Sequence, residues 1–283
     1  MKIGSRDMSS RPTGPLAPRC RLCHNQQMSG SATFRAGTCL VPEAISAVAG
    51  IQKRIQQGAV FVDLDDTLLD YQRENRRALH NLAQAIGVPP GNLLDTYVEA
   101  GQTAPGEKPR QPDRVLHAMA ACAPLLSAES RSAYRDFYYR QRLAHVRPLD
   151  GAHLLLRQLR QCSPRVVLAT HGLDIIQRQR LRRAGLADYF DDIIVSESRG
   201  VTKDDWSRFL PKSYLPLAAR SAVISDSPYP DLDRARHLGM ATVLVDTCGR
   251  LRAGDRFDLV VTGPRQLARL LAASGKDGGG RRC

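Results

Sequence analysis

Residues 61–70, with the sequence FVDLDDTLLD, constrain the fold more than any other part of the chain. An apolar run over residues 59–62 ends directly in Asp63, and Asp65 follows two positions later. A short apolar run of this kind is typical of a buried strand in a parallel sheet. Open α/β sheets bind their ligands at the carboxyl ends of the strands, which is where Asp63 would lie. Two carboxylates this close can share one divalent cation, while one acts as a nucleophile and the other as a proton donor.

Three later segments also join an apolar strand pattern to polar residues near its end. They span residues 165–172, 192–203 and 221–231, and the polar residues of interest are Thr170, His171, Lys203, Asp226 and Asp231. A threonine hydroxyl can donate a hydrogen bond to a phosphate oxygen, and a lysine supplies a compact positive charge. Carboxylate oxygens are ligands that suit Mg²⁺. The four segments follow one another along the chain, and each has an apolar run before its polar residues.

Taken in order, these segments resemble the four motifs of the haloacid dehalogenase (HAD) superfamily. The first is similar to motif I, which is Asp-x-Asp-x-Thr after a hydrophobic strand, and the strand that ends in Thr170 is similar to motif II. The resemblance implies that Asp63 is the nucleophile and that Asp65 is the general acid and base. It further implies that Thr170 and Lys203 contact the transferring phosphoryl group, and it assigns His171 to substrate binding.

The same resemblance implies Mg²⁺ as the cofactor. The ion would be held by the carboxylate of Asp63, the backbone carbonyl of Asp65 and the carboxylate of Asp226. Asp231 would support the motif III lysine or the water shell of the ion. Acidic oxygen ligands suit Mg²⁺ rather than zinc.

Two positions depart from the usual motifs. The family usually follows its motif III lysine with proline, whereas Asp204 follows Lys203, so Lys212 remains an alternative for that lysine. Ser225 replaces the glycine that usually precedes the motif IV aspartate, which adds a side chain beside the metal. These departures leave open a non-catalytic relative on the same fold.

The resemblance implies a HAD-type phosphatase, which is a Mg²⁺-dependent phosphomonoester hydrolase that acts through an aspartyl-phosphate intermediate. Asp65 argues against halide removal, because a departing halide needs no proton and the family's dehalogenases lack this aspartate. A sugar phosphomutase keeps both aspartates and stays open as an alternative. Motif I and the Arg-Arg-Ala helix after it look like the pyrimidine 5′-nucleotidase and N-acylneuraminate-9-phosphatase branches. The expected substrate is therefore a small phosphorylated metabolite, either a nucleotide or a sugar phosphate.

The pattern of apolar residues predicts an α/β fold, with a Rossmann-like parallel sheet core and an inserted α-helical cap. Strands and helices alternate after residue 151, which is typical of a parallel sheet covered by helices on both faces. About 95 residues separate the first two motifs, and they contain helical patterns at 73–86, 93–100, 115–123 and 129–144. These helices resemble the cap that the superfamily inserts after motif I.

We expect the core at residues 51–70 and 148–271 and the cap at 71–147. The loop at 101–113, which contains Lys108 and Arg110, is where we expect the cap to reach the site. Such a cap would exclude water and select the substrate.

The two ends of the chain differ in composition from the part between them. Residues 1–50 are rich in Ser, Arg, Gly and Pro, which predicts a disordered, targeting or wrongly assigned N-terminal extension. Residues 43–57, which begin inside this extension and end after it, could form a short helix at the edge of the core. Residues 272–283 predict a disordered tail.

Charge and cysteine content restrict the class of protein. The net charge of +13 includes +6 in residues 1–58 and +2 in residues 272–283, which leaves +5 for the body of the chain. This distribution argues against a nucleic-acid partner and suits phosphorylated substrates. Seven scattered cysteines, an odd number, favour reduced thiols and a cytoplasmic location. No run approaches 18 apolar residues, so we expect no membrane-spanning helix.

Overall fold

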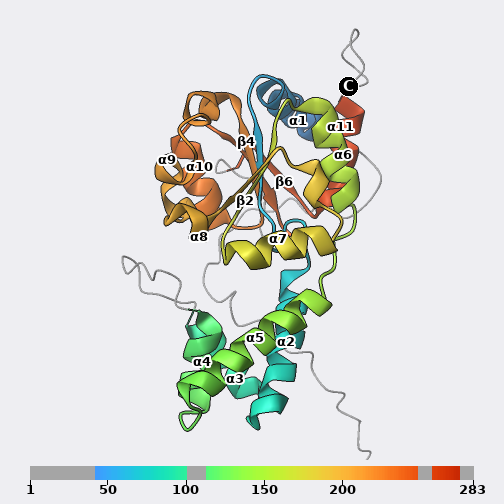
Figure 1. The fold of residues 1–283 in the computed structure, drawn as a ribbon. Helices are drawn as coiled ribbons and strands as arrows, with labels where there is room; N and C mark the ends of the chain where they lie inside the picture. Colours follow the sequence, from blue (N-terminus) through green and yellow to red (C-terminus); the bar gives the residue numbers. More distant parts are fainter. Residues whose placement is uncertain (1–41, 101–112, 248–256, 275–283) are drawn as a thin grey trace, which may run out of the picture. The chain divides into compact units, whose positions relative to one another are not determined.

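A six-stranded parallel sheet forms the core of the molecule (Figure 1). The computed structural model describes residues 42–100, 113–247 and 257–274. The strand order is β3-β2-β1-β4-β5-β6. The strands are β1 (Val60–Val62), β2 (Val166–Thr170), β3 (Asp192–Val195), β4 (Ala222–Ser225), β5 (Ala241–Val245) and β6 (Leu259–Val261). Strands β1 to β4 lie in the four segments where the sequence showed strand patterns, and the predicted α/β fold with a parallel sheet is confirmed.

The helices lie between the strands and in one insertion after β1. The longer ones are α1 (Pro42–Ile55), α2 (Tyr71–Ile86), α3 (Pro90–Glu99), α4 (Arg114–Cys122), α5 (Ala128–Ala144), α6 (Ala152–Cys162), α7 (Asp174–Arg183) and α11 (Pro264–Ser274). The short ones are α8 (Ser196–Arg199), α9 (Trp206–Phe209) and α10 (Asp233–His237). No helix in the described ranges is long and apolar enough to cross a membrane.

Strand β1 has a special place in the sheet because the direction of the strand order changes beside it. Val60 is paired with Val166 of β2 on one side and with Ala222 of β4 on the other. The chain adds β2 and β3 on the first side and then crosses β1 to add β4, β5 and β6. Ligands of open α/β sheets bind at such a switch point, outside the carboxyl ends of the strands. Asp63, the residue after β1, lies at that point.

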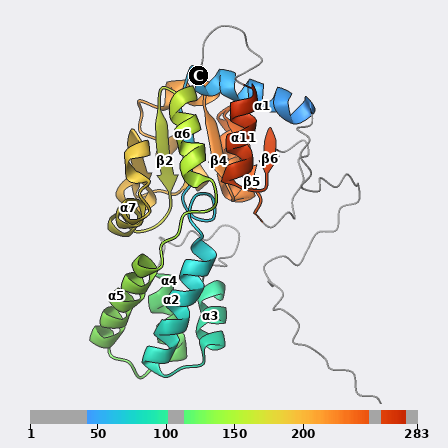
Figure 2. The ribbon, with the colours of Figure 1, turned by 90° about the vertical axis from the view of Figure 1, so that its right-hand side faces the viewer.

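Both faces of the sheet are covered, and the alternation of side chains along β1 shows it. Val60 and Val62 pack into a cluster with α1, α6 and α11, which lie together over one face in Figure 2. Phe61 points to the opposite face, where its ring contacts Trp206 and Tyr214 edge to face, with centroids 6.0 and 5.5 Å apart. Because both faces of the sheet are buried, consecutive residues along its strands are apolar.

Helices α2 to α5 form the predicted insertion and have an apolar core of their own. That core includes Leu79, Leu82, Leu93, Met119 and Tyr138. The side chain of Asp70 accepts a hydrogen bond from the backbone N–H of Arg73 at the start of α2, and Gly87 ends the helix with φ of 71°. Because the insertion can bury its own apolar residues, it forms a separate helical layer after motif I. Most of the predicted cap loop at 101–113, including Lys108 and Arg110, lies outside the described residues.

Two domain boundaries differ from the sequence prediction. The predicted helix at 43–57 is present as α1, but it begins at Pro42, inside the range 1–50 that was assigned to an extension. Val48 and Ile51 of this helix are buried in the sheet core, so the core starts before residue 51. At the other end α11 continues to Ser274, because Leu270 and Leu271 still pack on the core. Residues 1–41 and 275–283 lie outside the described part of the chain.

The structure describes two of the seven cysteines. Cys122 and Cys162 are thiols on α4 and α6, and the other five lie outside the described residues.

Candidate active site

The nucleophile candidate, Asp63, lies in the switch-point position at the end of β1. Its backbone N–H donates to the carbonyl oxygen of Ile224, 2.9 Å away, which continues the pairing between β1 and β4. The side chain is buried, and Nζ of Lys203 donates to its Oδ1 atom at 2.7 Å. Burial, and the carboxylates of Asp231 and Asp65 nearby, raise the pKa of Asp63, while Lys203 opposes that rise.

Lys203 is the lysine that the fold brings to this site. Its side chain is 1% exposed and forms ion pairs with both Asp63 and Asp231. Burial alone would lower the pKa of Lys203, but the two carboxylates raise it above its ordinary value, so the ammonium stays charged. Lys212, the alternative from the sequence, is exposed on the surface. The missing proline is therefore no obstacle, because a 3₁₀ helix over Lys203–Asp205 carries the lysine into the core.

Asp231 is held by several groups, and one of them is the unexpected Ser225. The hydroxyl of Ser225 donates to Oδ2 of Asp231 at 3.1 Å and accepts from the backbone N–H of Ser227 at 3.1 Å. The indole N–H of Trp206 donates to the backbone carbonyl of Asp231 at 2.8 Å. Burial would raise the pKa of Asp231, but Lys203 and His171 bring it well below its usual range. Ser225 thus supports an ionised Asp231, and its side chain is fully buried.

Asp231 lies in a turn between β4 and α10. Residues Pro228–Leu232 form a π-type turn in which Tyr229 has non-helical dihedral angles, and α10 begins only at Asp233. The two prolines in this turn cannot donate backbone hydrogen bonds, so the regular helix starts after them.

Asp226, the predicted metal ligand directly after β4, is held by a hydrogen bond to motif I. Its backbone N–H donates to the hydroxyl of Thr67 at 2.8 Å. Burial together with repulsion from Asp63 and Asp66 raises the pKa of Asp226 well above its ordinary value. Buried carboxylates that repel each other in this way are stabilised by a cation between them.

The donor set fits a magnesium ion. Within the described ranges, no three His, Cys, Asp or Glu side chains gather as ligands for one metal. Mg²⁺ does not require such a cage, because it keeps several waters and is usually held by one or two carboxylates. The carboxylates of Asp63 and Asp226 and the carbonyl of Asp65 are hard oxygen donors of the kind it prefers.

Thr170 and His171 lie at the carboxyl end of β2, next to the motif I loop. The hydroxyl of Thr170 is buried and accepts a hydrogen bond from Nε2 of Gln177 at 3.0 Å. The same Nε2 atom donates to the backbone carbonyl of His171 at 2.6 Å. Nε2 of His171 lies 3.6 Å from Oδ1 of Asp231, and its Nδ1 atom is buried without a hydrogen-bond partner. All the predicted site residues therefore share one edge of the sheet.

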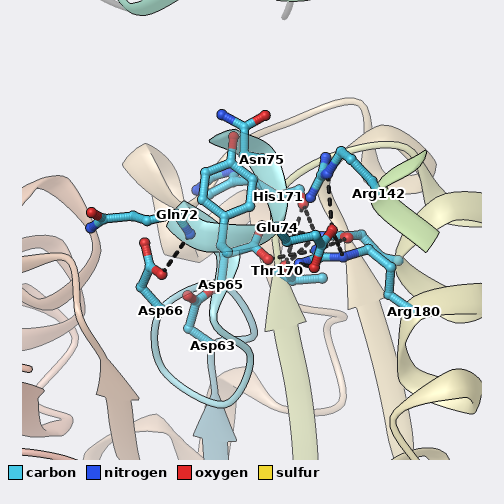
Figure 3. A network of polar contacts seen from close by, with 12 residues as sticks. Asp63, Asp65, Asp66, Gln72, Glu74, Asn75, Arg142, Thr170, His171 and Arg180 are labelled. Atoms are coloured by element: carbon cyan, nitrogen blue, oxygen red, sulfur yellow. Dashed lines mark hydrogen bonds and ion pairs between the residues drawn. The ribbon is translucent and has the colours of Figure 1, made fainter. Parts of the chain in front are cut away.

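Asp65, the predicted acid and base, is held by charged groups that sequence reasoning missed. Figure 3 shows it in a network with Glu74, Arg142 and Arg180. Nη1 of Arg180 donates to Oδ1 of Asp65 at 2.5 Å, and Gln177 donates to Oδ2 at 3.3 Å. Burial would raise the pKa of Asp65, but Arg180 and Arg142 bring it below its ordinary value.

These partners could not be identified from the sequence. Helix α7 carries four arginines, and nothing in its sequence distinguishes Arg180 from Arg178, Arg182 or Arg183. Glu74 is the only acidic residue in the arginine-rich start of α2, which is a weak signal. Its burial depends on how α2 packs near α7, which the sequence does not show.

The family of haloacid dehalogenase-like hydrolases matches the chain over residues 58–239, a range that contains all four motifs. Among curated proteins, the glyceraldehyde 3-phosphate phosphatase of Methanopyrus kandleri is 26% identical over 245 residues, covering 77% of this chain and 99% of that protein. The pyrimidine 5′-nucleotidase YjjG of Escherichia coli is 34% identical over 98 residues, which cover 34% of this chain and 43% of that protein.

A crystal structure of YfnB from Bacillus subtilis, bound to magnesium, shares the fold with a TM-score of 0.60 and 22% identity. The match covers 76% of this chain and 99% of that one. The curated relatives named above carry phosphatase and nucleotidase names. The family match and the gathering of its motif residues at one edge of the sheet show that the chain belongs to the haloacid dehalogenase-like hydrolases.

Proposed function

We propose that the protein is a Mg²⁺-dependent phosphomonoester hydrolase that acts on a small phosphorylated metabolite through an aspartyl-phosphate intermediate. The observation that carries this proposal is the Asp63 carboxylate at the sheet's switch point, with the buried Lys203 ammonium 2.7 Å away and Asp65 two residues further on. A nucleophile, a fixed positive charge and a second carboxylate are the groups that phosphoryl transfer to and from an aspartate requires.

In the first step, a carboxylate oxygen of Asp63 attacks phosphorus, and the bond from phosphorus to the leaving oxygen breaks. Because Arg180 and Arg142 lower the pKa of Asp65, its carboxylate must first take up a proton from solvent, and it then gives that proton to the oxygen as it leaves. In the second step, Asp65 takes a proton from the water that attacks the phosphorus of the aspartyl-phosphate, which releases phosphate and restores Asp63.

The transferring group carries negative charge, and two residues on the chain can offset it. Lys203 is held in its charged form by Asp63 and Asp231, and Thr170 can donate a hydrogen bond from its hydroxyl. Gln177 fixes the Thr170 hydroxyl, and His171 beside it is a candidate for substrate binding. The buried site keeps water from screening these interactions.

Magnesium would be held by the carboxylates of Asp63 and Asp226 and by the backbone carbonyl of Asp65. When bound, it supplies positive charge to the phosphoryl oxygens and offsets the repulsion among the carboxylates. HAD-family enzymes are typically Mg²⁺-dependent, and magnesium is bound in the YfnB structure, which shares this fold.

The relatives suggest where to look for the substrate. Relatives named glyceraldehyde 3-phosphate phosphatase cover most of the chain, and one named ribulose-1,5-bisphosphate 5-phosphatase, from Halopiger xanaduensis, is 27% identical over 220 residues. The nucleotidase relative matches a shorter part. Sugar phosphates are therefore the first substrates to test, followed by nucleoside monophosphates.

The test is hydrolysis of 4-nitrophenyl phosphate with millimolar Mg²⁺ by the wild type and the Asp63→Asn variant, followed by a screen of phosphorylated metabolites. We expect Asp63→Asn to lose on the order of 10³-fold or more in kcat, and chelation by EDTA to remove the activity. Asp188→Asn is a matched control, because Asp188 is an exposed aspartate. Full activity in Asp63→Asn would overturn the proposal, and isomerisation of a sugar phosphate without phosphate release would favour a mutase.

A further inference from the structure

Arg180 has no role in the proposed mechanism, although it is the most deeply buried charged residue in the described part of the chain. Its side chain is 0% exposed and lies between two carboxylates. Nη1 donates to Oδ1 of Asp65 at 2.5 Å, Nη2 donates to Oε2 of Glu74 at 2.9 Å, and Nε lies 2.8 Å from Oε1 of Glu74. The guanidinium thus engages both oxygens of Glu74 and one oxygen of Asp65.

This arrangement holds Asp65 from a single helix. One oxygen of its carboxylate is bound by Arg180 and the other by Gln177, and both of these residues lie on α7. Gln177 and Arg180 are also joined to each other, since Nη1 of Arg180 donates to Oε1 of Gln177 at 2.7 Å. The side chain of Asp65 is nevertheless 29% exposed, so it can still meet a ligand.

Glu74 ties Arg180 to the cap. It is fully buried at the start of α2, and Nε of Arg142, from α5, donates to its Oε1 atom at 3.0 Å. The guanidinium of Arg142 lies over the ring of Tyr71, 4.8 Å from its centroid. A buried charged residue keeps its place only while its partners remain, because an unpaired charge in the interior costs several kcal/mol. The position of Arg180 therefore depends on helices of both the core and the cap.

We propose that Arg180 is a positioning residue that holds the Asp65 carboxylate for proton transfer to the leaving oxygen, and that Glu74 holds Arg180 in place. This inference rests on the proposed function, because it gives Arg180 a role only through Asp65. Arg180 itself does not contact the reacting atoms in this role. Arginine suits it because a planar, forked guanidinium can engage two carboxylates at once, which an ammonium cannot do with fixed geometry.

If Arg180 positions Asp65, the loss of activity on changing Arg180 should depend on how basic the leaving oxygen of the substrate is. A purely structural role for Arg180 predicts no such dependence. An acid is needed most when the leaving oxygen is strongly basic, as in phenyl phosphate. It is needed least in 2,4-dinitrophenyl phosphate, whose leaving group is stable without a proton. A variant that misplaces Asp65 should therefore lose turnover of phenyl phosphate selectively, whereas partial unfolding would reduce both reactions equally.

The experiment compares kcat/KM for these two substrates in the wild type, Arg180→Gln and Arg180→Lys, with Mg²⁺ present. We expect Arg180→Gln to lose roughly 10²-fold with phenyl phosphate and less than about tenfold with 2,4-dinitrophenyl phosphate. Arg180→Lys should lose less of that selectivity, because it keeps a charge near Asp65. Arg182→Gln is the control, since Arg182 is exposed on the same helix. For this variant, the ratio of kcat/KM for phenyl phosphate to kcat/KM for 2,4-dinitrophenyl phosphate should equal that of the wild type.

Two further variants guard against misfolding and against indirect effects. Glu74→Gln would leave the buried Arg142 without its ion-pair partner, so Arg180→Gln is combined with both Glu74→Gln and Arg142→Gln, which removes all three buried charges and gives the same comparison if the single variant unfolds in a thermal melt. In an Asp65→Asn background, Arg180→Gln should cause no further selective loss, because the two changes remove the same function.

The outcomes separate this inference from the proposed function. If hydrolysis depends on Asp63 but the ratio between the two substrates is unchanged in the Arg180 variants, the positioning role is wrong and the proposed function stands. The positioning role is equally wrong if Arg180→Gln lowers the ratio further in the Asp65→Asn background. If Asp63→Asn is as active as the wild type, both ideas are overturned.

Discussion

Nζ of Lys203 lies 2.7 Å from Oδ1 of Asp63, although the two residues are 140 positions apart in the chain. Lys203 also pairs with Asp231, so one buried cation serves two buried carboxylates. Removing one partner of a buried ion pair is strongly destabilising, because the charge of the other partner is left without compensation.

Lys203→Met should therefore lower both activity and stability. We expect a loss of about 3–5 kcal/mol in the free energy of unfolding, measured by urea denaturation. Activity should fall by at least about 10²-fold, because the positive charge beside the phosphoryl group is lost. Lys212→Met is the matched control, since Lys212 is exposed and should change neither quantity by much. A larger effect from Lys212→Met than from Lys203→Met would return the motif III role to Lys212.

The positions of Asp63, Thr170 and Asp226 could be anticipated from the sequence for a simple reason. Each follows or ends a segment with a strand pattern, and the carboxyl ends of parallel strands lie along one edge of a sheet. Knowing that the strands are parallel is enough to bring these residues together. The sheet order was not needed for that inference.

The surroundings of Asp65 could not be anticipated in this way. Arg180 and Gln177 lie on a helix with many polar residues, and which of them faces inward depends on how that helix packs. Glu74 and Arg142 belong to two helices of the insertion that meet only in the folded chain. Ser225 stands where the family usually has glycine, and only its hydrogen bond to Asp231 shows that its side chain supports the site.

Magnesium should stabilise the folded protein through Asp226. Ligand binding to the folded state adds RT ln(1 + [L]/Kd) to stability, which is about 2.7 kcal/mol at 100 times Kd. We expect addition of Mg²⁺ to raise the midpoint of thermal unfolding of the wild type but not of Asp226→Asn. Asp188→Asn should keep the shift, because that residue is exposed away from the motif positions. An equal Mg²⁺-dependent shift in Asp226→Asn would show that the ion binds elsewhere.

Ser225→Ala should destabilise the protein modestly. The variant leaves Oδ2 of Asp231 and the backbone N–H of Ser227 each with one hydrogen bond fewer. A typical buried hydrogen bond contributes about 1 kcal/mol, and leaving a buried group without a partner costs about 1–3 kcal/mol. Urea denaturation should show a loss in this range, whereas Ser213→Ala, at an exposed position, should change stability by less than about 0.5 kcal/mol. No measurable loss in Ser225→Ala would mean that Ser225 does not support Asp231.

Asp66 should make the metal-free protein less stable as the pH rises. It is held with φ of 53°, and Oδ1 accepts a hydrogen bond from the backbone N–H of Gln72 at 3.1 Å. Burial, with the charge of Asp65 adding to it, raises the pKa of Asp66 from 3.8 to about 6. Between about pH 4 and pH 6 the folded state then keeps a proton that the unfolded state has lost, so stability decreases across this interval.

Asp66→Asn removes this titration while keeping a hydrogen-bond acceptor and a residue that tolerates positive φ. Without Mg²⁺, we expect the stability of Asp66→Asn relative to the wild type to increase from pH 4 to pH 6, by up to about 3 kcal/mol, and then to level off. Urea denaturation of both proteins at each pH in EDTA measures this difference. Mg²⁺ should reduce it, because a nearby cation favours the ionised carboxylate. A constant difference between pH 4 and pH 7 would show that the pKa of Asp66 is not raised.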